Sequence, residues 1–134
     1  MGTVDKPQLL FYQKMGELFY AIAAADKVVR KAEYDILKNI VAEQWKNLDD
    51  YEDPFHSDAA YQIEVVFDWF DYEQLDASDC FESFADYKKE NPKLFTKERK
   101  DLIWKTANAI ASSFAAKNKS EVIMLAKLKM LLEN

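Results

Sequence analysis

The chain has 134 residues, of which 49% are hydrophobic and 14% aromatic, with only 2 Gly and 3 Pro. This length suits one domain with a packed core, and the scarcity of turn residues favours long helices over an all-β fold. Cys80 is the single cysteine and His56 the single histidine, so neither a disulfide nor a Cys/His zinc cluster can form within the chain. We predict one all-α domain spanning residues 1–134 that folds without a cofactor.

The charge is unevenly distributed along the chain. Residues 49–90 contain 14 acidic and 2 basic side chains, whereas residues 91–134 contain 9 basic and 4 acidic ones. An acidic surface of this size repels phosphate backbones, so we expect no nucleic-acid partner; the segment is either a solvated face or a surface for cations or basic proteins. Asp5 and Pro7 stand where a secretion signal has its apolar run, and no segment approaches the roughly 20 apolar residues of a membrane span. We expect a cytoplasmic protein that does not insert into membranes.

The first 46 residues predict two helices joined by a short elbow. Apolar residues recur at helical spacing over residues 8–25, and a second helix ends near residues 45–46. Gly16 interrupts the first helix, and glycine weakens a helix by roughly 1 kcal/mol. We therefore expect Gly16 to mark the close approach of another helix backbone.

The acidic middle, residues 47–92, predicts a loop followed by two further helices. Residues 47–58 have no helical period and contain Pro54, and Ser57 or Asp58 is a candidate cap for a helix over residues 59–72. Asp76 and Ser78 are candidate caps for a shorter helix that ends before Asn91–Pro92. The predicted buried positions of these two helices are Ile63, Val66, Phe67, Phe70, Phe81, Phe84 and Tyr87.

Residues 97–133 predict the last pair of helices. Thr96 is a plausible cap for the first of them, and Asn118 with Glu121 forms the capping-box pattern at the start of the second. Together these segments predict a bundle of about six to seven helices. The buried side of the final helix is predicted to contain Leu125, Leu128 and Leu132.

The two helix pairs, at about residues 8–46 and 97–133, are similar in sequence. Residues 21–37 align with residues 109–125 without a gap, at an offset of 88, and six of the 17 positions are identical. Helix pairs repeated in this way often pack about a pseudo-twofold axis. Two amphipathic helix pairs can also look alike through shared composition, so this alternative stays open.

The first elbow reads Ala-Ile-Ala-Ala-Ala-Asp-Lys-Val-Val-Arg-Lys-Ala-Glu over residues 21–33. This segment resembles the hallmark of the TerB-like (tellurite-resistance) family, in which an alanine-rich helix end is followed by Asp-Gly, an N-cap and a Glu early in the next helix. The family also includes the N-terminal region of certain DnaJ-type co-chaperones. The resemblance implies an all-α bundle with two pseudo-symmetric helix-elbow-helix units.

The same resemblance implies a site for a calcium or magnesium ion, made by Asp26, Glu33 and Glu121. Oxygen donors of this kind suit hard cations. The chain departs from the family pattern at two positions, because Lys27 replaces the Gly of the first elbow and Phe114 replaces the Asp of the second. Arg30 or Lys27 is a candidate partner for Asp26, so we expect any such site to be weak or vestigial.

The acidic middle also contains ten aromatic residues, more than two short helices can easily bury. Aromatic side chains are enriched at the centres of protein interfaces, and carboxylates around them add specificity. We predict a partner-binding surface in this segment. Its candidate residues are Tyr51, Asp68, Trp69, Asp71 and Tyr72.

No recognised catalytic pattern is found. The chain lacks the paired Glu-x-x-His motifs of di-iron proteins and any glycine-rich phosphate loop, and Asp79 and Glu82 beside Cys80 should raise the pKa of its thiol. We therefore predict no catalytic residues and a non-enzymatic TerB-like module for protein interaction or stress response. A divalent-cation sensor and an enzyme with an unrecognised carboxylate site are the alternatives, and a homodimer remains open.

Overall fold

The computed structural model describes residues 6–48, 59–113 and 118–133, and within these ranges every regular element is helical. The predicted all-α bundle of about six to seven helices is therefore confirmed. The α-helices are α1 (Lys6–Ala23), α2 (Lys31–Ile40), α3 (Lys46–Leu48), α4 (Gln62–Glu73), α5 (Ala77–Glu90), α6 (Lys97–Ser112) and α7 (Lys119–Glu133). A π-helical segment, η1 (Val41–Trp45), joins α2 to α3, and 3-10 turns form η2 (Ala59–Tyr61) and η3 (Pro92–Leu94).

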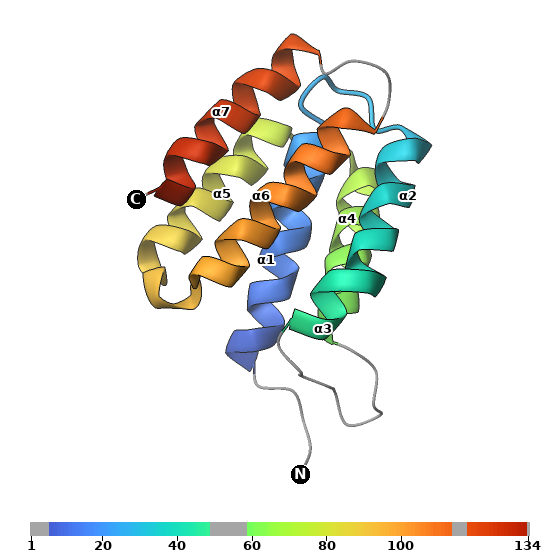
Figure 1. The fold of residues 1–134 in the computed structure, drawn as a ribbon. Coiled ribbons are helices and arrows are strands. Elements are labelled where there is room, and N and C mark those ends of the chain that lie inside the picture. Colours follow the sequence, from blue (N-terminus) through green and yellow to red (C-terminus); the bar gives the residue numbers. More distant parts are fainter. Residues whose placement is uncertain (1–5, 49–58, 114–117, 134) are drawn as a thin grey trace.

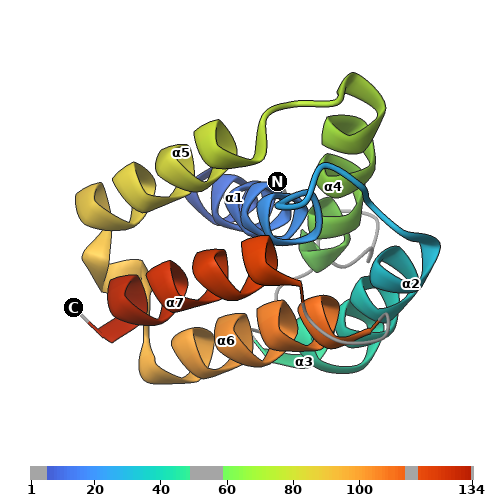
Figure 2. The same ribbon diagram turned by 90° about the horizontal axis from the view of Figure 1, so that it is seen from above.

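Helix α1 is the centre of the bundle. It contacts α4, α5, α6 and α7, and the view along the bundle shows these four helices arranged around it (Figure 2). Helix α2 lies on the outside, where it packs against α6. The elbow between α1 and α2 and the start of α7 lie at the same end of the bundle (Figure 1).

Gly16 allows α1 and α4 to approach closely, as its position in the sequence predicts. A Cβ atom at this position would lie 2.6 Å from the backbone oxygen of Ile63 and 2.9 Å from the Cβ of Val66. Real Cβ atoms do not approach backbone oxygens so closely, so no larger residue fits without a shift of α4. The contact fixes α4 against the central helix.

Most of the predicted helix starts are confirmed by their caps. Thr96 Oγ1 accepts a hydrogen bond from Arg99 N at 3.2 Å, and Asp76 Oδ2 accepts one from Asp79 N at 3.0 Å. Ser78, the other candidate, lies inside α5. The predicted caps Ser57 and Asp58 lie outside the described residues. Residues 47 and 48, which the sequence assigned to the loop, belong to α3.

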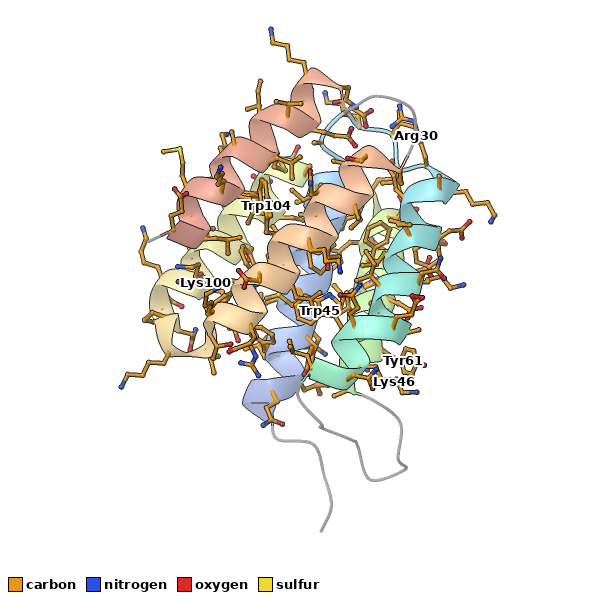
Figure 3. All side chains as sticks on the ribbon, in the orientation of Figure 1. Arg30, Trp45, Lys46, Tyr61, Lys100 and Trp104 are labelled. Atoms are coloured by element: carbon orange, nitrogen blue, oxygen red, sulfur yellow. The ribbon has the colours of Figure 1, made fainter. Side chains whose placement is uncertain are left out.

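The end of the second predicted helix is a π-helical turn, which places Trp45 in the core. The Trp45 side chain is fully buried and its Nε1 donates to Thr106 Oγ1 of α6 at 3.0 Å. Figure 3 labels Trp45 between α6 and the α2–α3 segment. This buried hydrogen bond satisfies the indole N–H and joins the outer helix to the bundle.

Over the residues that are described, none of the helices combines the length and the apolarity that crossing a membrane requires.

Candidate functional site

The elbow after α1 is a tight turn in which Lys27 takes a left-handed conformation, with φ at 70°. Lys27 N donates to Ala24 O at 2.8 Å, and Asp26 Oδ1 accepts from Val28 N at 3.1 Å. The TerB-like pattern has glycine at this position, and a left-handed residue with a side chain costs roughly 1–2 kcal/mol. Lys27 therefore holds a conformation that favours glycine, and the two hydrogen bonds around it close the turn.

Asp26 connects the two elbows. Its Oδ2 accepts a hydrogen bond from Arg30 Nη1 at 2.9 Å and another from Asn118 Nδ2, at the start of α7, at 2.7 Å. Arg30 is thus the predicted internal cation that pairs with Asp26. Arg30 and Asn118 are equivalent positions at the offset of 88, so the residues preceding α2 and α7 hold the same carboxylate oxygen.

Glu33 and Glu121 occupy equivalent places in the first turns of α2 and α7, and both are buried, with 1% and 2% of their surface exposed. Glu33 Oε1 accepts from Arg30 N at 2.7 Å. At α7 the predicted capping box is present, because Glu121 N donates to Asn118 Oδ1 at 2.9 Å and Asn118 N donates to Glu121 Oε1 at 3.4 Å. Both glutamates therefore cap their own helices.

The two buried carboxyl groups also interact with each other. The pKa of Glu33 is raised to about 8, first by burial and then by a hydrogen bond with Glu121, although the bond from Arg30 N opposes the shift. Among the described residues, Glu121 Oε2 has no hydrogen-bond partner. Two adjacent carboxyl groups in an apolar setting cannot both ionise at low cost, so the pair retains a proton near neutral pH.

The three predicted metal ligands lie around this junction, but their oxygen atoms are largely engaged. Asp26 accepts hydrogen bonds from three donors, and a proton held between Glu33 and Glu121 takes the place of a cation. In the part of the chain that is described, no group of three or more His, Cys, Asp or Glu residues is arranged to hold a metal ion. Ion binding by Asp26, Glu33 and Glu121 stays a prediction, and the arrangement as it stands does not fit the ion.

The second candidate site is the outward side of α4, which we call the α4 face and which consists of Tyr61, Glu64, Val65, Asp68, Trp69 and Tyr72. The exposed fractions are 56% for Val65, 58% for Trp69 and 84% for Tyr72. The opposite side of α4 carries the predicted stripe, of which Ile63, Val66 and Phe67 are buried and Phe70 is partly buried. The expected exposed aromatic patch is therefore present.

Two grooves run beside the α4 face. The residues of the face and Tyr34 of α2 line the first, the α4 groove, which has a volume of about 510 Å³. The second groove, about 390 Å³, lies between α4 and α1 and includes Leu10 and Gln62. Val65 and Trp69 line both grooves, so they form the ridge between them.

The predicted partner-binding residues divide between different places. Asp68, Trp69 and Tyr72 line the α4 groove, whereas Asp71 lines a separate hollow of about 620 Å³ below the first elbow. Tyr51 lies outside the described residues. Figure 3 shows Arg30 of the elbow and Tyr61 of the α4 face at opposite ends of the bundle.

The polar side chains of the elbow hollow take part in the local structure. Tyr20 Oη donates to Leu75 O at 2.7 Å, Asp76 caps α5, and Gln74 Nε2 donates to Asp71 Oδ1 at 3.4 Å. Burial raises the pKa of Asp71, and the nearby Asp68 charge raises it further. No pair of carboxylates in this hollow is distinguished from the rest by its setting, so an enzyme with a carboxylate site stays an alternative prediction.

Cys80 lies inside the bundle with 4% of its surface exposed. The pKa of its thiol is raised to about 12, first by burial and then by the charges of Glu17, Asp76 and Asp79. The sequence predicted the direction from neighbouring acids, but burial is the larger cause. His56, the single histidine of the chain, lies outside the described residues.

Sequence reasoning placed Asp26, Glu33 and Glu121 in one site but missed the bond between Asn118 and Asp26 that joins the two elbows. The bond from Asn118 to Asp26 spans 92 residues, whereas the sequence assigns Asn118 only the local capping role. The repeat carried a usable signal, because equivalent residues near a pseudo-twofold axis lie close to one another. The identical pair Glu33 and Glu121 was the position at which to expect such a contact.

No protein-family model, no curated protein and no solved structure matches this chain. The TerB-like resemblance therefore depends on the elbow residues themselves. It stays a prediction, together with the activity and partners that it implies.

Proposed function

We propose that this chain is a TerB-like helical module without enzymatic activity that binds a protein partner through the α4 face. Its setting would be a stress-response assembly of the tellurite-resistance kind or an adaptor role. The observation that carries the proposal is the exposure of Trp69 and Tyr72, at 58% and 84%, on a helix whose other side is firmly packed. Exposed large aromatic residues on a rigid element are typical of interface centres.

The shape and charge of the α4 face support docking. The ridge formed by Val65 and Trp69 stands between two grooves, so a partner can contact the side chains from both sides. Glu64 and Asp68 lie along the α4 groove, and such charges select the partner and its orientation more than they add affinity. A partner with a basic or apolar complementary surface fits this arrangement.

The proposed module has no enzymatic activity, because the side chains with the most strongly shifted pKa values are not accessible to a substrate. Glu33, with a pKa near 8, and Cys80, with a pKa near 12, are both buried. Neither side chain lines the elbow hollow or the two grooves beside α4. An acid, base or nucleophile must reach its substrate, so these two groups suit structural roles.

Charge reversal on the α4 face tests the proposal. The double variant Glu64→Lys/Asp68→Lys, at the two acidic residues of the α4 groove, and, separately, Trp69→Ala should lose the proteins that the wild-type chain retains from a native lysate, measured by quantitative mass spectrometry. The matched control is Glu82→Lys/Asp86→Lys, which makes the same charge change at two exposed positions of α5. Recovery of the same proteins with all four chains would exclude docking through this face.

A divalent-cation sensor is the second candidate function. The observation in its favour is the buried, adjacent pair Glu33 and Glu121, with an oxygen atom of Glu121 that no donor of the described residues contacts. A calcium or magnesium titration that raises the melting temperature by several degrees, with the increase abolished by Asp26→Ala, would support it. An unchanged melting temperature in both ions would leave docking as the function.

A further inference from the structure

The α4 groove combines aromatic surfaces with carboxylates. Tyr34 stacks on Phe67 with ring centroids 5.5 Å apart at an interplanar angle of 25°, so its other ring face is turned away from this core contact. Trp69 and Tyr72 lie along the same groove and are more than half exposed. The groove is therefore bordered by several aromatic rings, which present negative faces to a cation.

Two acidic side chains, Glu64 and Asp68, line the α4 groove. The pKa of the Tyr34 hydroxyl is raised first by burial and then by the charges of Asp68, Glu64 and Asp35. Burial also raises the pKa of Glu64, which reports partial desolvation of a carboxylate beside the rings. A cation bound in the groove would lower the raised pKa values of Tyr34 and Glu64, because it stabilises their charged forms. It would also be attracted to the faces of the aromatic rings.

One cation of the chain itself already uses an edge of this groove. Lys38 Nζ lies 5.4 Å from the centroid of the Tyr34 ring. The same ammonium group lowers the pKa of Glu64, so it is close enough to act on the carboxylate. The contact is an internal example of an ammonium group over a ring of the groove, with an electrostatic effect on a nearby carboxylate, and Trp69, Tyr72 and Asp68 line the rest of the groove.

We propose that the α4 groove binds an arginine side chain from a basic segment of the partner protein. This inference rests on the proposed docking function and specifies the chemistry of its partner. Arginine suits the groove better than lysine, because a planar guanidinium stacks on ring faces and donates two parallel hydrogen bonds to a carboxylate. Trp69 and Tyr72 supply the ring faces, and Asp68 and Glu64 supply the acceptors.

Peptide binding to the full chain tests the assignment. The probe is a short fluorescein-labelled peptide of alternating arginine and glycine, and its counterpart carries citrulline, which has the shape of arginine without its charge. We expect fluorescence anisotropy to show the arginine peptide binding at least about tenfold more tightly than the citrulline peptide, since cation–π and ionic contacts are both lost. The difference should shrink as salt is raised, because exposed charges are screened.

Matched variants separate the groove from general attraction to an acidic protein. Glu64→Gln/Asp68→Asn and Trp69→Leu should each weaken arginine-peptide binding about fivefold or more, whereas Trp69→Phe, which keeps a ring, should retain most of the affinity. Glu82→Gln/Asp86→Asn removes the same charge from α5 and should leave binding nearly unchanged. Circular dichroism and melting temperature confirm that each variant is folded, as expected for exposed positions.

Two results would overturn the arginine assignment. One is equal binding of the citrulline peptide, which would indicate an apolar occupant, and the other is equal weakening by the α4 and α5 charge variants, which would indicate non-specific attraction. If either occurs while Trp69→Ala still loses its lysate proteins, docking stands and only the arginine site falls. If the arginine peptide binds as expected but Trp69→Ala retains the same lysate proteins, the proposed docking function falls and the arginine site stands.

Discussion

The Glu33–Glu121 pair should make the stability of the bundle depend on pH in a direction opposite to that of most carboxylates. The folded chain holds a proton on the pair up to a pH of about 8, whereas an unfolded glutamate releases it near 4.5. Folding therefore binds a proton between these two values. Stability is fully present below pH 4.5, falls as pH rises, and reaches its lower level once pH exceeds the folded-state pKa.

The size of the effect follows from the shift in pKa. One pKa unit corresponds to about 1.36 kcal/mol, so a shift from 4.5 to about 8 sets an upper value of roughly 5 kcal/mol for the loss. Water entry and small movements around the ionised pair reduce this cost, and we expect a loss of about 2–4 kcal/mol between pH 5 and pH 9. A domain of this size has a stability of about 5–15 kcal/mol, so the loss is readily measurable.

The variant Glu33→Gln isolates the pair from all other titrating groups. The amide oxygen can still accept from Arg30 N, as Glu33 Oε1 does at 2.7 Å, and the amide nitrogen can donate to the Glu121 carboxylate in place of the shared proton. Urea unfolding followed by circular dichroism, at several pH values, gives the free energy of both chains. We expect similar stability near pH 5 and a variant more stable by about 2–4 kcal/mol near pH 9.

A control glutamate that also lies in a first helical turn, but without burial, completes the test. Glu98 lies in the first turn of α6 and is exposed, so Glu98→Gln should leave the pH dependence parallel to that of the wild-type chain. Parallel curves for wild type and Glu33→Gln would refute the reasoning, because they would show that the pair does not retain a proton in the folded chain. A free energy of unfolding that rises from pH 5 to pH 9 in the wild type alone would do the same.

Three further substitutions or reactions address the packing. Gly16→Ala should destabilise the chain by at least about 2 kcal/mol in urea unfolding, because its Cβ would clash with the backbone of α4 at 2.6 Å. Asn118→Ala should cost about 2 kcal/mol, through loss of the α7 cap and of the bond to Asp26, while Ser120→Ala, an exposed neighbour, should cost little. Cys80 should react with iodoacetamide at least about a hundredfold more slowly in the folded chain than in urea, because burial raises its thiol pKa to about 12.

The helix starts could be predicted because their signals are local. Thr96 and Asp76 accept hydrogen bonds from residues three positions later, and Asn118 and Glu121 cap each other over the same distance. A side chain that caps the start of its own helix can be recognised from a pattern of four consecutive residues. Gly16 was readable for a similar reason, since an interior glycine in a helix needs a packing explanation.

The junction between the elbows could not be predicted in the same way. The contact of Asp26 with Asn118 depends on the approach of two segments 92 residues apart, and the sequence of neither segment indicates that it contacts the other. The likeness of the two halves placed Glu33 over Glu121, yet whether equivalent residues meet depends on how close they lie to the axis. Only the packing of α2 against α6 and of α7 against α6 and α1 brings the two carboxyl groups together in the core.

The α4 face was partly predictable from helical geometry. Once Ile63, Val66 and Phe67 are assigned to the core, a helix of 3.6 residues per turn places Val65, Trp69 and Tyr72 on other sides. The positions of the acidic residues were harder to predict, because Asp68 and Asp71 lie only one and two residues from Trp69 of the ridge. Tyr34 of α2 closes the groove beside Asp68 and not beside Asp71, and a separate helix cannot be foreseen from the α4 sequence.

The two candidate sites differ in how far the chain satisfies its own polar groups. At the elbows, Arg30 and Asn118 neutralise and fix Asp26, and a retained proton compensates Glu33 and Glu121, so an incoming ion would have to displace bonds that already exist. On the α4 face, Trp69 and Tyr72 stay more than half exposed to solvent over the part of the chain that the structure describes. The close contact at Gly16 holds α4 rigidly against α1, and a rigid face loses little conformational entropy on binding. Free energy gained by covering Trp69 and Tyr72 is therefore retained as affinity, which is the physical reason to place recognition on α4 and structural support at the elbows.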